Sequence, residues 1–349
     1  MKRDHLRYLA CPRCKHDLAL QNVTAETTKG IEAGGLRCTA CASKFAITRH
    51  VPRFVASESY AGSFGAQWRL HALTQLDSHT GADISSQRFF TETGWPTRLA
   101  GELILEVGGG AGRFTEPAAG TGAMVVSVDL SEAVDVNYSS HGQLDNLLIV
   151  QADVYMLPFK EELFDRVFCF GVLQHTPDVE EAFRALSRCV KRGGDLAIDV
   201  YRRRTGIKRA LETKRWVRPL TTRLPQAGLY RFCRQYVTYM WPVVTQLRRV
   251  PRIGRALSYR LLIPDYHGLF ALSDETLKEW AILDMFDMVS PAYDQPQSLD
   301  TVRRWFSDSR FRQVDVRYGY NGIQGRGVKS ATTINERSAP TDAAVGLSR

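Results

Sequence analysis

Residues 103–114, LILEVGGGAGRF, place a short apolar run directly before a loop with four glycines. This order is typical of a buried strand whose following loop passes close to a ligand or to another part of the backbone. Further apolar runs follow at intervals that leave room for helices, at 124–128, 147–150, 167–170 and 196–200. The alternation predicts an α/β fold with a doubly wound, mostly parallel sheet. Ligands of such sheets bind beyond the carboxyl ends of the strands, where the glycine loop falls.

The glycine loop by itself does not identify the ligand, because several nucleotide-binding folds share a strand, a glycine loop and a helix. A phosphate-binding P-loop is excluded, since no Lys-Ser or Lys-Thr pair follows the glycines. A dinucleotide fingerprint also fits poorly: counted from Gly108, its third glycine would fall at Arg113. The ligand class must therefore come from the residues around the loop.

Three acids follow consecutive predicted strands. Glu106 ends the first strand, Asp129 ends the second and Asp153 follows the third. We expect the three carboxylates to converge at one edge of the sheet, where they would repel a pyrophosphate and suit a ligand with a ribose diol, an amine and a positive charge. Each acid alone has a simpler interpretation as a helix N-cap or a loop carboxylate.

Composition indicates a globular protein large enough for one sizeable domain and a smaller one. The 349 residues are 44% hydrophobic and carry 46 Lys and Arg against 37 Asp and Glu, a net charge of +9. No run of about 18 uncharged apolar residues occurs, and the N-terminal stretch MKRDHLRYLACPRC lacks the apolar segment of a signal peptide. We therefore expect a cytoplasmic protein, with peripheral contact at the inner face of the membrane as the alternative.

Four of the seven cysteines form two CxxC pairs, Cys11 with Cys14 and Cys38 with Cys41. This spacing predicts a structural zinc ion held by four thiolates, with no open position for water or substrate. A ribbon of about 50 residues has too little core to stand alone, so the metal would supply most of its folding energy. The other three cysteines, Cys169, Cys189 and Cys233, are expected to be small buried hydrophobes.

Residues 202–260 concentrate the positive charge. They contain 16 Lys and Arg and one acid, Glu212, a net +15 in a chain of net +9. Aromatic residues are interleaved, and the segment is expected to be helical with breaks at Pro219, Pro225, Pro242 and Pro251. The segment predicts contact with an anionic acceptor, an acidic membrane surface or RNA. The alternative is a solvated helical cap whose arginine stems cover apolar surface.

The motifs together resemble a known family. The stretches LILEVGGGAGRF, VVSVDLS (125–131), VQADVYMLPF (150–159), FDRVFCFGVLQHTPD (164–178) and VKRGGDLAI (190–198) are similar to the class I S-adenosylmethionine-dependent methyltransferases of the methyltransferase type 11 group. The resemblance implies a Rossmann-like sheet that is mostly parallel and whose last strand is antiparallel. Residues 311–320 and 325–332 would supply the last two strands of this sheet. Residues 1–54 are similar to the zinc ribbon that precedes some bacterial methyltransferases, including ribosomal RNA methyltransferases and uncharacterised enzymes associated with surface glycans.

The resemblance also implies site residues for S-adenosylmethionine. Asp129 would take the ribose hydroxyls, and Asp153 with Val154 would face the adenine. Leu130 and Phe170 complete the set. The methionine end of the cofactor would be lined by Glu106, Gly108, Gly110 and Gly112. Gly109 stands where many members of the family have cysteine, a departure not expected to prevent binding.

His175 is the candidate catalytic residue, because it follows the fourth strand and its ordinary pKa suits proton removal from a hydroxyl. The alternative, slightly favoured by its position before Pro177, is that His175 braces the loop. Asp265, Tyr266 and His267 form a second cluster whose distance from the site the sequence does not reveal.

The sequence therefore predicts an S-adenosylmethionine-dependent methyltransferase that O-methylates a glycan, a lipid-linked sugar or another small anionic acceptor. An RNA methyltransferase is the alternative, and a non-catalytic zinc-ribbon scaffold with the methyltransferase fold is the second. The expected organisation is a zinc ribbon at 1–54, a helical connector and lid at 55–100, the cofactor-binding core at 101–201, a basic aromatic helical insert at 202–272, a C-terminal completion of the methyltransferase domain at 273–330 and a disordered tail at 331–349.

Overall fold

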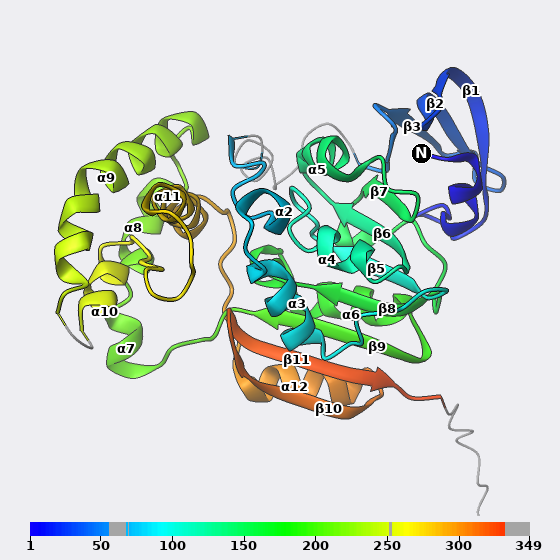
Figure 1. The fold of residues 1–349 in the computed structure, drawn as a ribbon. Coiled ribbons are helices and arrows are strands. Elements are labelled where there is room, and N and C mark those ends of the chain that lie inside the picture. Colours follow the sequence, from blue (N-terminus) through cyan, green and yellow to red (C-terminus); the bar gives the residue numbers. More distant parts are fainter. Residues whose placement is uncertain (56–67, 69, 251–252, 332–349) are drawn as a thin grey trace, which may run out of the picture.

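The computed structural model describes residues 1–55, 68, 70–250 and 253–331, and Figure 1 traces them in chain order from blue to red. An eleven-stranded sheet runs through the molecule. Its central strands are β5 (Leu103–Val107), β6 (Met124–Asp129), β7 (Leu147–Gln151), β8 (Phe164–Cys169), β9 (Val190–Val200), β10 (Phe311–Gly319) and β11 (Gly322–Lys329). Five predicted apolar runs thus form the strands β5 to β9.

The topology is that of a doubly wound sheet with one reversed strand. The central order is β7-β6-β5-β8-β9-β11-β10. Strands β5 to β9 pair in parallel, whereas β11 pairs antiparallel with β9 and with β10. This confirms the predicted fold class, including the antiparallel last strand.

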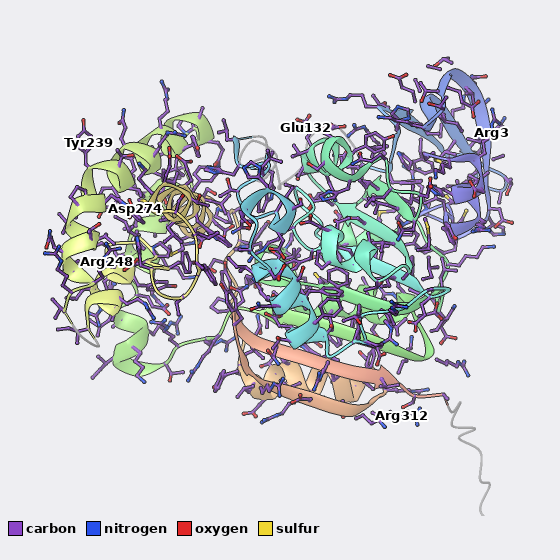
Figure 2. The ribbon with its side chains drawn as sticks, viewed as in Figure 1. Arg3, Glu132, Tyr239, Arg248, Asp274 and Arg312 are labelled. Atoms are coloured by element: carbon purple, nitrogen blue, oxygen red, sulfur yellow. The ribbon has the colours of Figure 1, made fainter. Side chains whose placement is uncertain are left out.

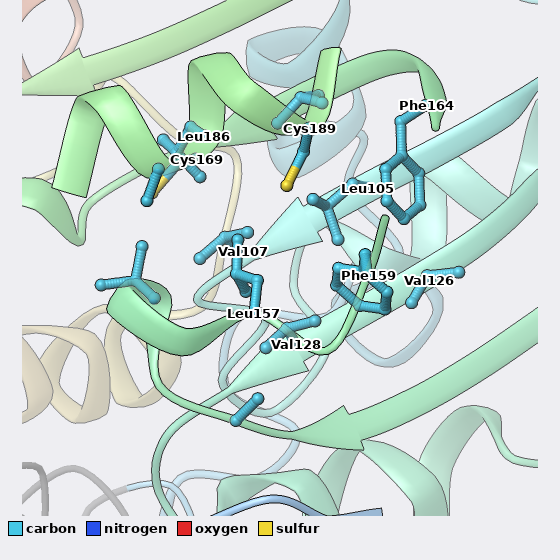
Figure 3. Close-up of a cluster of buried hydrophobic side chains, with 14 of the residues drawn as sticks. Leu105, Val107, Val126, Val128, Leu157, Phe159, Phe164, Cys169, Leu186 and Cys189 are labelled. Atoms are coloured by element: carbon cyan, nitrogen blue, oxygen red, sulfur yellow. The ribbon is translucent and has the colours of Figure 1, made fainter. Parts of the chain in front are cut away.

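Helices cover both faces of the sheet and separate its core into two hydrophobic clusters. α3 (Ile84–Thr93), α4 (Thr115–Gly120) and α5 (Ala133–His141) pack on the face that includes Ile104. α6 (Val179–Cys189) and α12 (Leu299–Asp308) pack on the face that includes Leu105 and Val107. Figure 3 shows part of this second cluster, in which Phe159 and Phe164 lie near Leu105. Burial on both faces explains why the strand sequences lack polar alternation.

The N-terminal strands extend the same sheet. β1 (Leu18–Thr27), β2 (Gly30–Cys38), β3 (Lys44–Thr48) and β4 (Val51–Arg53) pair antiparallel in sequence order, after the 3-10 helix η1 (Arg3–Tyr8). β4 then pairs in parallel with β7, through Arg53 and Gln151. Leu18, Ile31 and Leu36 share a hydrophobic cluster with the central sheet. A metal held by the four cysteines would therefore not be alone in stabilising these strands, which also pack on the core of the large domain.

The described part of residues 55–100 contains the helices α2 (Asp77–Thr80) and α3. The stretch predicted as a helical lid, residues 60–70, lies outside the described residues except for Trp68 and Leu70. The tail predicted to be disordered, 331–349, also lies outside them except for Ala331.

The basic segment is helical and has its own core. It contains α7 (Gly206–Ala210), α8 (Thr213–Thr221), α9 (Gln226–Leu247) and α10 (Gly254–Arg260), and Figure 1 shows them to one side of the sheet. α11 (Asp274–Val289), from the segment expected to complete the methyltransferase domain, packs against α9. Cys233, Val237 and Trp241 of α9 meet Leu277 and Phe286 of α11 in this core.

Two of the expected helix breaks are wrong. Pro219 lies inside α8 and Pro242 lies inside α9. A proline removes one backbone donor and presses on the preceding turn, but packing of the apolar face can offset this cost. Only Pro225 stands at a helix start, as the N-cap of α9, while Pro251 lies outside the described residues.

Candidate functional site

The glycine loop joins β5 to α4, and its conformation requires glycine. Gly108, Gly110 and Gly112 have φ of 84°, 53° and 101°, in the left-handed region that side chains disfavour. A Cβ at Gly108 would lie 2.1 Å from a methyl of Val172, and one at Gly110 would lie 3.1 Å from the ring of Trp68. Space and backbone angle therefore both exclude larger residues.

At Gly109 it is the lack of space for a Cβ, and not the backbone angle, that favours glycine. A Cβ at this position would lie 2.2 Å from the Ser127 hydroxyl and 3.2 Å from Glu106. The cysteine that many relatives carry here would collide with Ser127. The departure from the family pattern thus matches the side chain beneath it.

Asp129 holds the glycine loop against the end of β6. Its Oδ2 accepts a hydrogen bond from the Gly110 amide at 2.9 Å, and its Oδ1 accepts from the Ser131 amide at 2.8 Å and hydroxyl at 2.7 Å. Burial raises the pKa of Asp129, and these hydrogen bonds oppose that shift. A carboxylate oxygen has two lone pairs, so Oδ2 can still accept a hydrogen bond from a ligand, whereas both lone pairs of Oδ1 are used by Ser131.

A cavity of about 1640 Å³ opens beside this loop. It is larger than the 300–1,000 Å³ typical of a single small-molecule site. The cavity lies between the sheet edge and the helices of the insert. The predicted site residues in its lining are Gly108, Gly110, Asp129, Leu130, Val154, Phe170 and His175.

Three predicted cofactor residues lie outside the cavity lining. Glu106 is buried below the glycine loop, where its carboxylate accepts a hydrogen bond from the Thr115 hydroxyl. Gly112 faces the buried pair of Asn137 and His141. Asp153 accepts from the Tyr155 amide at 3.0 Å and begins the 3-10 helix η2 (Val154–Met156). Of the three carboxylates expected to converge, only Asp129 lines the cavity.

The position of Glu106 gives a pH-dependent prediction. Burial raises its pKa from 4.5 to about 7. A carboxyl whose pKa is higher in the folded than in the unfolded state loses its contribution to stability as the pH rises from about 4.5 through 7. Glu106→Gln keeps the shape without the charge, so at pH 8 we expect the variant to exceed wild type in free energy of unfolding by about 2–3 kcal/mol.

Urea unfolding at pH 5 and pH 8 tests this expectation. The advantage of Glu106→Gln should be small at pH 5, where wild type is protonated in the folded state. A variant that is equally destabilised at both pH values would show that Glu106 is ionised and satisfied in the native protein.

His175 lies at the cavity wall, in the 3-10 helix η3 (Leu173–His175). Its Nδ1 lies 3.0 Å from the backbone oxygen of Tyr293, and its ring meets the ring of Tyr201 edge-on at 5.4 Å. A carbonyl only accepts, so Nδ1 must carry the proton and Nε2 of the neutral ring holds the lone pair. Nε2 lies 4.0 Å from Asp287, which accepts from the Tyr201 hydroxyl at 2.9 Å. His175 thus both braces the loop and faces the cavity.

A buried polar cluster in the same cavity was missed in the sequence. The Tyr266 hydroxyl donates to Asp284, whose pKa burial raises to about 7. The Arg113 guanidinium lies over Trp280 at 5.3 Å, and burial lowers its pKa to about 10. Tyr266 belonged to the second predicted cluster, but Asp284 carried no signal. It comes from α11, nearly 180 residues beyond the glycine loop, and only tertiary packing brings it here.

Asp265 and His267, the other members of the second predicted cluster, lie outside the lining of the large cavity. His267 Nδ1 lies 2.6 Å from Asp265, and its Nε2 lies 2.8 Å from Asp274. Asp265 and His267 line a neighbouring cavity of about 930 Å³ instead.

The four predicted zinc ligands come together at the end of the ribbon. The Sγ atoms of Cys11, Cys14, Cys38 and Cys41 all lie within 4.8 Å of one another. Two Sγ pairs are separated by 3.6 Å and 3.4 Å. Tetrahedral zinc with Zn–S bonds of about 2.3 Å needs separations near 3.8 Å, so the donor set fits the ion with small adjustments. The other three cysteines are buried, as expected.

In the part of the chain that the structure describes, no helix combines the length and the apolar composition needed to cross a membrane.

Comparison with known proteins agrees with the geometry. Residues 105–198 match the family model described as a methyltransferase domain. A ubiquinone biosynthesis O-methyltransferase of Thiobacillus denitrificans is 37% identical over 100 residues, which are 28% of this chain and 43% of that protein. The protein of the same name from Coxiella burnetii is 33% identical over 108 residues, 30% of this chain and 46% of that protein. The chain thus covers less than half of either relative.

Among solved structures, a putative S-adenosyl-L-methionine-dependent methyltransferase from Methanococcus maripaludis aligns with a TM-score of 0.43 and 14% identity, over 80% of this chain and 98% of that one. Magnesium protoporphyrin IX methyltransferase from Synechocystis aligns with a TM-score of 0.42 and 16% identity, over 78% and 97%. The sequence matches, together with the sheet order and the glycine loop, confirm the predicted resemblance. Residues 105–198 thus match the methyltransferase domain family that the sequence motifs resemble.

Proposed function

We propose that the protein is an S-adenosylmethionine-dependent O-methyltransferase. The observation that carries this proposal is Asp129, held by the Gly110 amide at the mouth of the large cavity. The two relatives named as O-methyltransferases support the reaction class over their matched regions. The cavity also has room for a cofactor and a second substrate.

The residues at the sheet edge fit this cofactor. Asp129 would accept hydrogen bonds from the ribose hydroxyls, and Leu130 and Val154 would supply apolar contact for the adenine. Gly108 and Gly110 would let the methionine portion pass close to the backbone. When bound, S-adenosylmethionine supplies an activated methyl group on a sulfonium. Alignment of the acceptor oxygen with that carbon would account for several kcal/mol of the rate enhancement.

His175 would act as the base for a hydroxyl acceptor. Its Nδ1 is held by Tyr293, which leaves Nε2 as the proton-accepting nitrogen. The acceptor oxygen would bond to the methyl carbon as the carbon–sulfur bond breaks, and the hydroxyl proton would pass to Nε2. His175→Asn is therefore expected to lower kcat by about 100-fold or more.

The readouts for His175→Asn are kcat across pH and cofactor affinity. The affinity for S-adenosylmethionine should stay within about threefold of wild type, because the side chain is not needed to hold the cofactor. The loss of kcat should persist across the pH range, because an asparagine side chain cannot accept the hydroxyl proton. If kcat is unchanged and only the melting temperature falls, His175 braces the loop and is not the base.

An anionic acceptor fits the wall opposite the glycine loop. Arg202, Arg203, Arg204, Lys208 and Lys214 all line the large cavity. We favour a hydroxyl on a lipid-linked glycan, with RNA as the alternative acceptor. Transfer of a radiolabelled methyl group to each acceptor class separates the two. Binding to RNA would fall steeply with salt, because each phosphate contact releases counterions.

The exposed face of α9 favours contact with an anionic membrane. Phe232, Tyr239 and Val243 are exposed along one side of this helix, and Figure 2 shows Tyr239 pointing away from the molecule. Trp216 on α8 is 71% exposed. Aromatic and apolar side chains among many arginines are typical of a helix that lies in the interface of an acidic bilayer.

Vesicle binding tests this surface. We expect wild type to sediment with phosphatidylglycerol-containing vesicles and not with purely zwitterionic ones. Phe232→Ser/Tyr239→Ser should weaken binding by at least about tenfold, since each buried aromatic side chain contributes about 1.5–3 kcal/mol. Val314→Ser removes an exposed apolar residue of β10 and should have no effect. Equal binding by all three proteins would remove α9 from the proposal.

A further inference from the structure

The second cavity, of about 930 Å³, lies among α7, α8, α10 and the segment after α10. Its lining is strongly basic. It contains Arg204, Lys208, Lys214, Arg248, Arg255 and Arg260. Two carboxylates, Glu212 and Asp265, also line it, so six cations face two anions and the cavity carries a formal charge of +4 with His267 neutral.

Part of this charge is already neutralised within the protein. Arg204 pairs with Glu212 at 3.2 Å, and Lys214 pairs with Asp294 at 2.9 Å. His267 holds Asp265.

Four cations of the second cavity remain without such a partner. In the described ranges, no ion pair is formed by Lys208, Arg248, Arg255 or Arg260, although Arg255 donates a hydrogen bond to the His267 carbonyl. Arg248, labelled in Figure 2, follows the last residue of α9, and Arg260 ends α10. Four cations from three parts of the insert leave a strongly positive potential around one cavity, which an anionic ligand would offset.

The two cavities share a wall. Arg204, Lys208, Lys214 and Tyr259 line both of them. The Arg204 guanidinium lies 5.8 Å from the centre of the Tyr259 ring. A single elongated ligand could therefore reach from His175 past Lys208 and Lys214 into the second cavity.

We propose that the second cavity binds a diphosphate group of the acceptor, while the acceptor's hydroxyl reaches His175 in the first. This inference rests on the proposed methyltransferase function. A diphosphate group is anionic, so these four cations would offset its charge, and guanidinium groups bind phosphate oxygens through paired hydrogen bonds. Exposed Leu211 and Val250 also line this cavity. They provide apolar surface where a lipid chain attached to the diphosphate would leave.

Calorimetric titration with inorganic pyrophosphate tests the subsite. Arg248→Gln/Arg260→Gln should weaken pyrophosphate binding by at least about tenfold, because charge-assisted hydrogen bonds to phosphate oxygens are stronger than neutral ones. Arg223→Gln/Arg249→Gln is the matched control, because it removes the same charge from the same helical segment outside both cavities. This control should bind pyrophosphate like wild type. Both variants should bind S-adenosylmethionine like wild type.

Two results would overturn the subsite. One is absence of pyrophosphate binding by wild type, and the other is equal weakening in both double variants, which would indicate only diffuse attraction to the basic surface. Failure of the methyltransferase proposal looks different, since wild type would then not bind S-adenosylmethionine whatever pyrophosphate does. Farnesyl diphosphate and uridine diphosphate distinguish the source of the group. We expect the farnesyl compound to bind more tightly than pyrophosphate, and tighter binding of the uridine compound would contradict a lipid-linked acceptor.

Discussion

Cys38→Ser is expected to abolish zinc binding and to release β1, β2 and β3 from the sheet. Cys38 is buried, and its Sγ accepts hydrogen bonds from the amides of Ala40 and Cys41, both at 3.4 Å. Structural zinc contributes about 10–16 kcal/mol to the folding of small ribbons. Loss of one of four thiolates should therefore lower the local free energy of unfolding by at least about 5 kcal/mol.

The central sheet limits how far this unfolding spreads. The Ala10 amide donates to Pro158 at 2.8 Å, and the Lys15 ammonium donates to Leu157 at 2.7 Å. Beyond these contacts, β4 still pairs with β7 through Arg53. We expect trypsin to cleave Cys38→Ser within residues 1–54 while residues 70–250 stay resistant.

Metal analysis and limited proteolysis of Cys38→Ser measure the two effects. Cys189→Ala is the control, since Cys189 is buried on α6 and lies outside the four-cysteine cluster. This control should retain one zinc per chain and an intact ribbon. A Cys38→Ser protein that resists proteolysis as well as wild type would contradict a structural role for the metal.

The sheet core could be predicted because its signals are local. Residues 103–107 are apolar except for Glu106 and precede a glycine loop, which together specify a buried strand and a close backbone turn. The N-terminal cap of α6 is also a local signal, because Asp178 stands three residues before Glu181 in the sequence. Its side chain accepts a hydrogen bond from the Glu181 amide.

The C-terminal end of that helix has no reliable local signal. A Gly-Gly pair such as Gly193-Gly194 is typical of a helix stop, but α6 ends at Cys189 and both glycines lie inside β9. Gly194 packs so closely that a Cβ would lie 2.6 Å from the Asp165 oxygen. The glycine at 194 is visible in the sequence, but the reason for it is the close contact with Asp165 of β8, which only the structure reveals.

The site residues divide in the same way, into those that local sequence signals place and those that only tertiary packing places. Asp129 and His175 follow strands and so fall at the sheet edge by topology alone. Glu106 also ends a strand, yet its side chain points to the protein interior, because Thr115 and Ser127 form a polar pocket below the loop. Asp284 could not be predicted from the sequence, since it lies on α11, far along the chain from the glycine loop, and only tertiary packing brings it to the cavity.

Asp129→Ala is expected to weaken S-adenosylmethionine binding by at least about 100-fold. A hydrogen bond from a ribose hydroxyl to the Asp129 carboxylate contributes about 1.5–3 kcal/mol. The variant also removes the acceptor of the Gly110 amide, so the glycine loop loses its anchor. Asp129→Asn keeps that acceptor and should give a smaller loss. Asp145→Ala removes a carboxylate whose side chain is 96% exposed and should bind like wild type.

The most direct test of the account is calorimetric titration of zinc-loaded wild type with S-adenosylmethionine beside Asp129→Ala. We expect wild type to bind S-adenosylmethionine at one site per chain with micromolar or tighter affinity, and Asp129→Ala to lose this binding. A folded, zinc-loaded wild type that binds no S-adenosylmethionine would contradict the proposed function and leave the zinc-ribbon scaffold as the remaining interpretation.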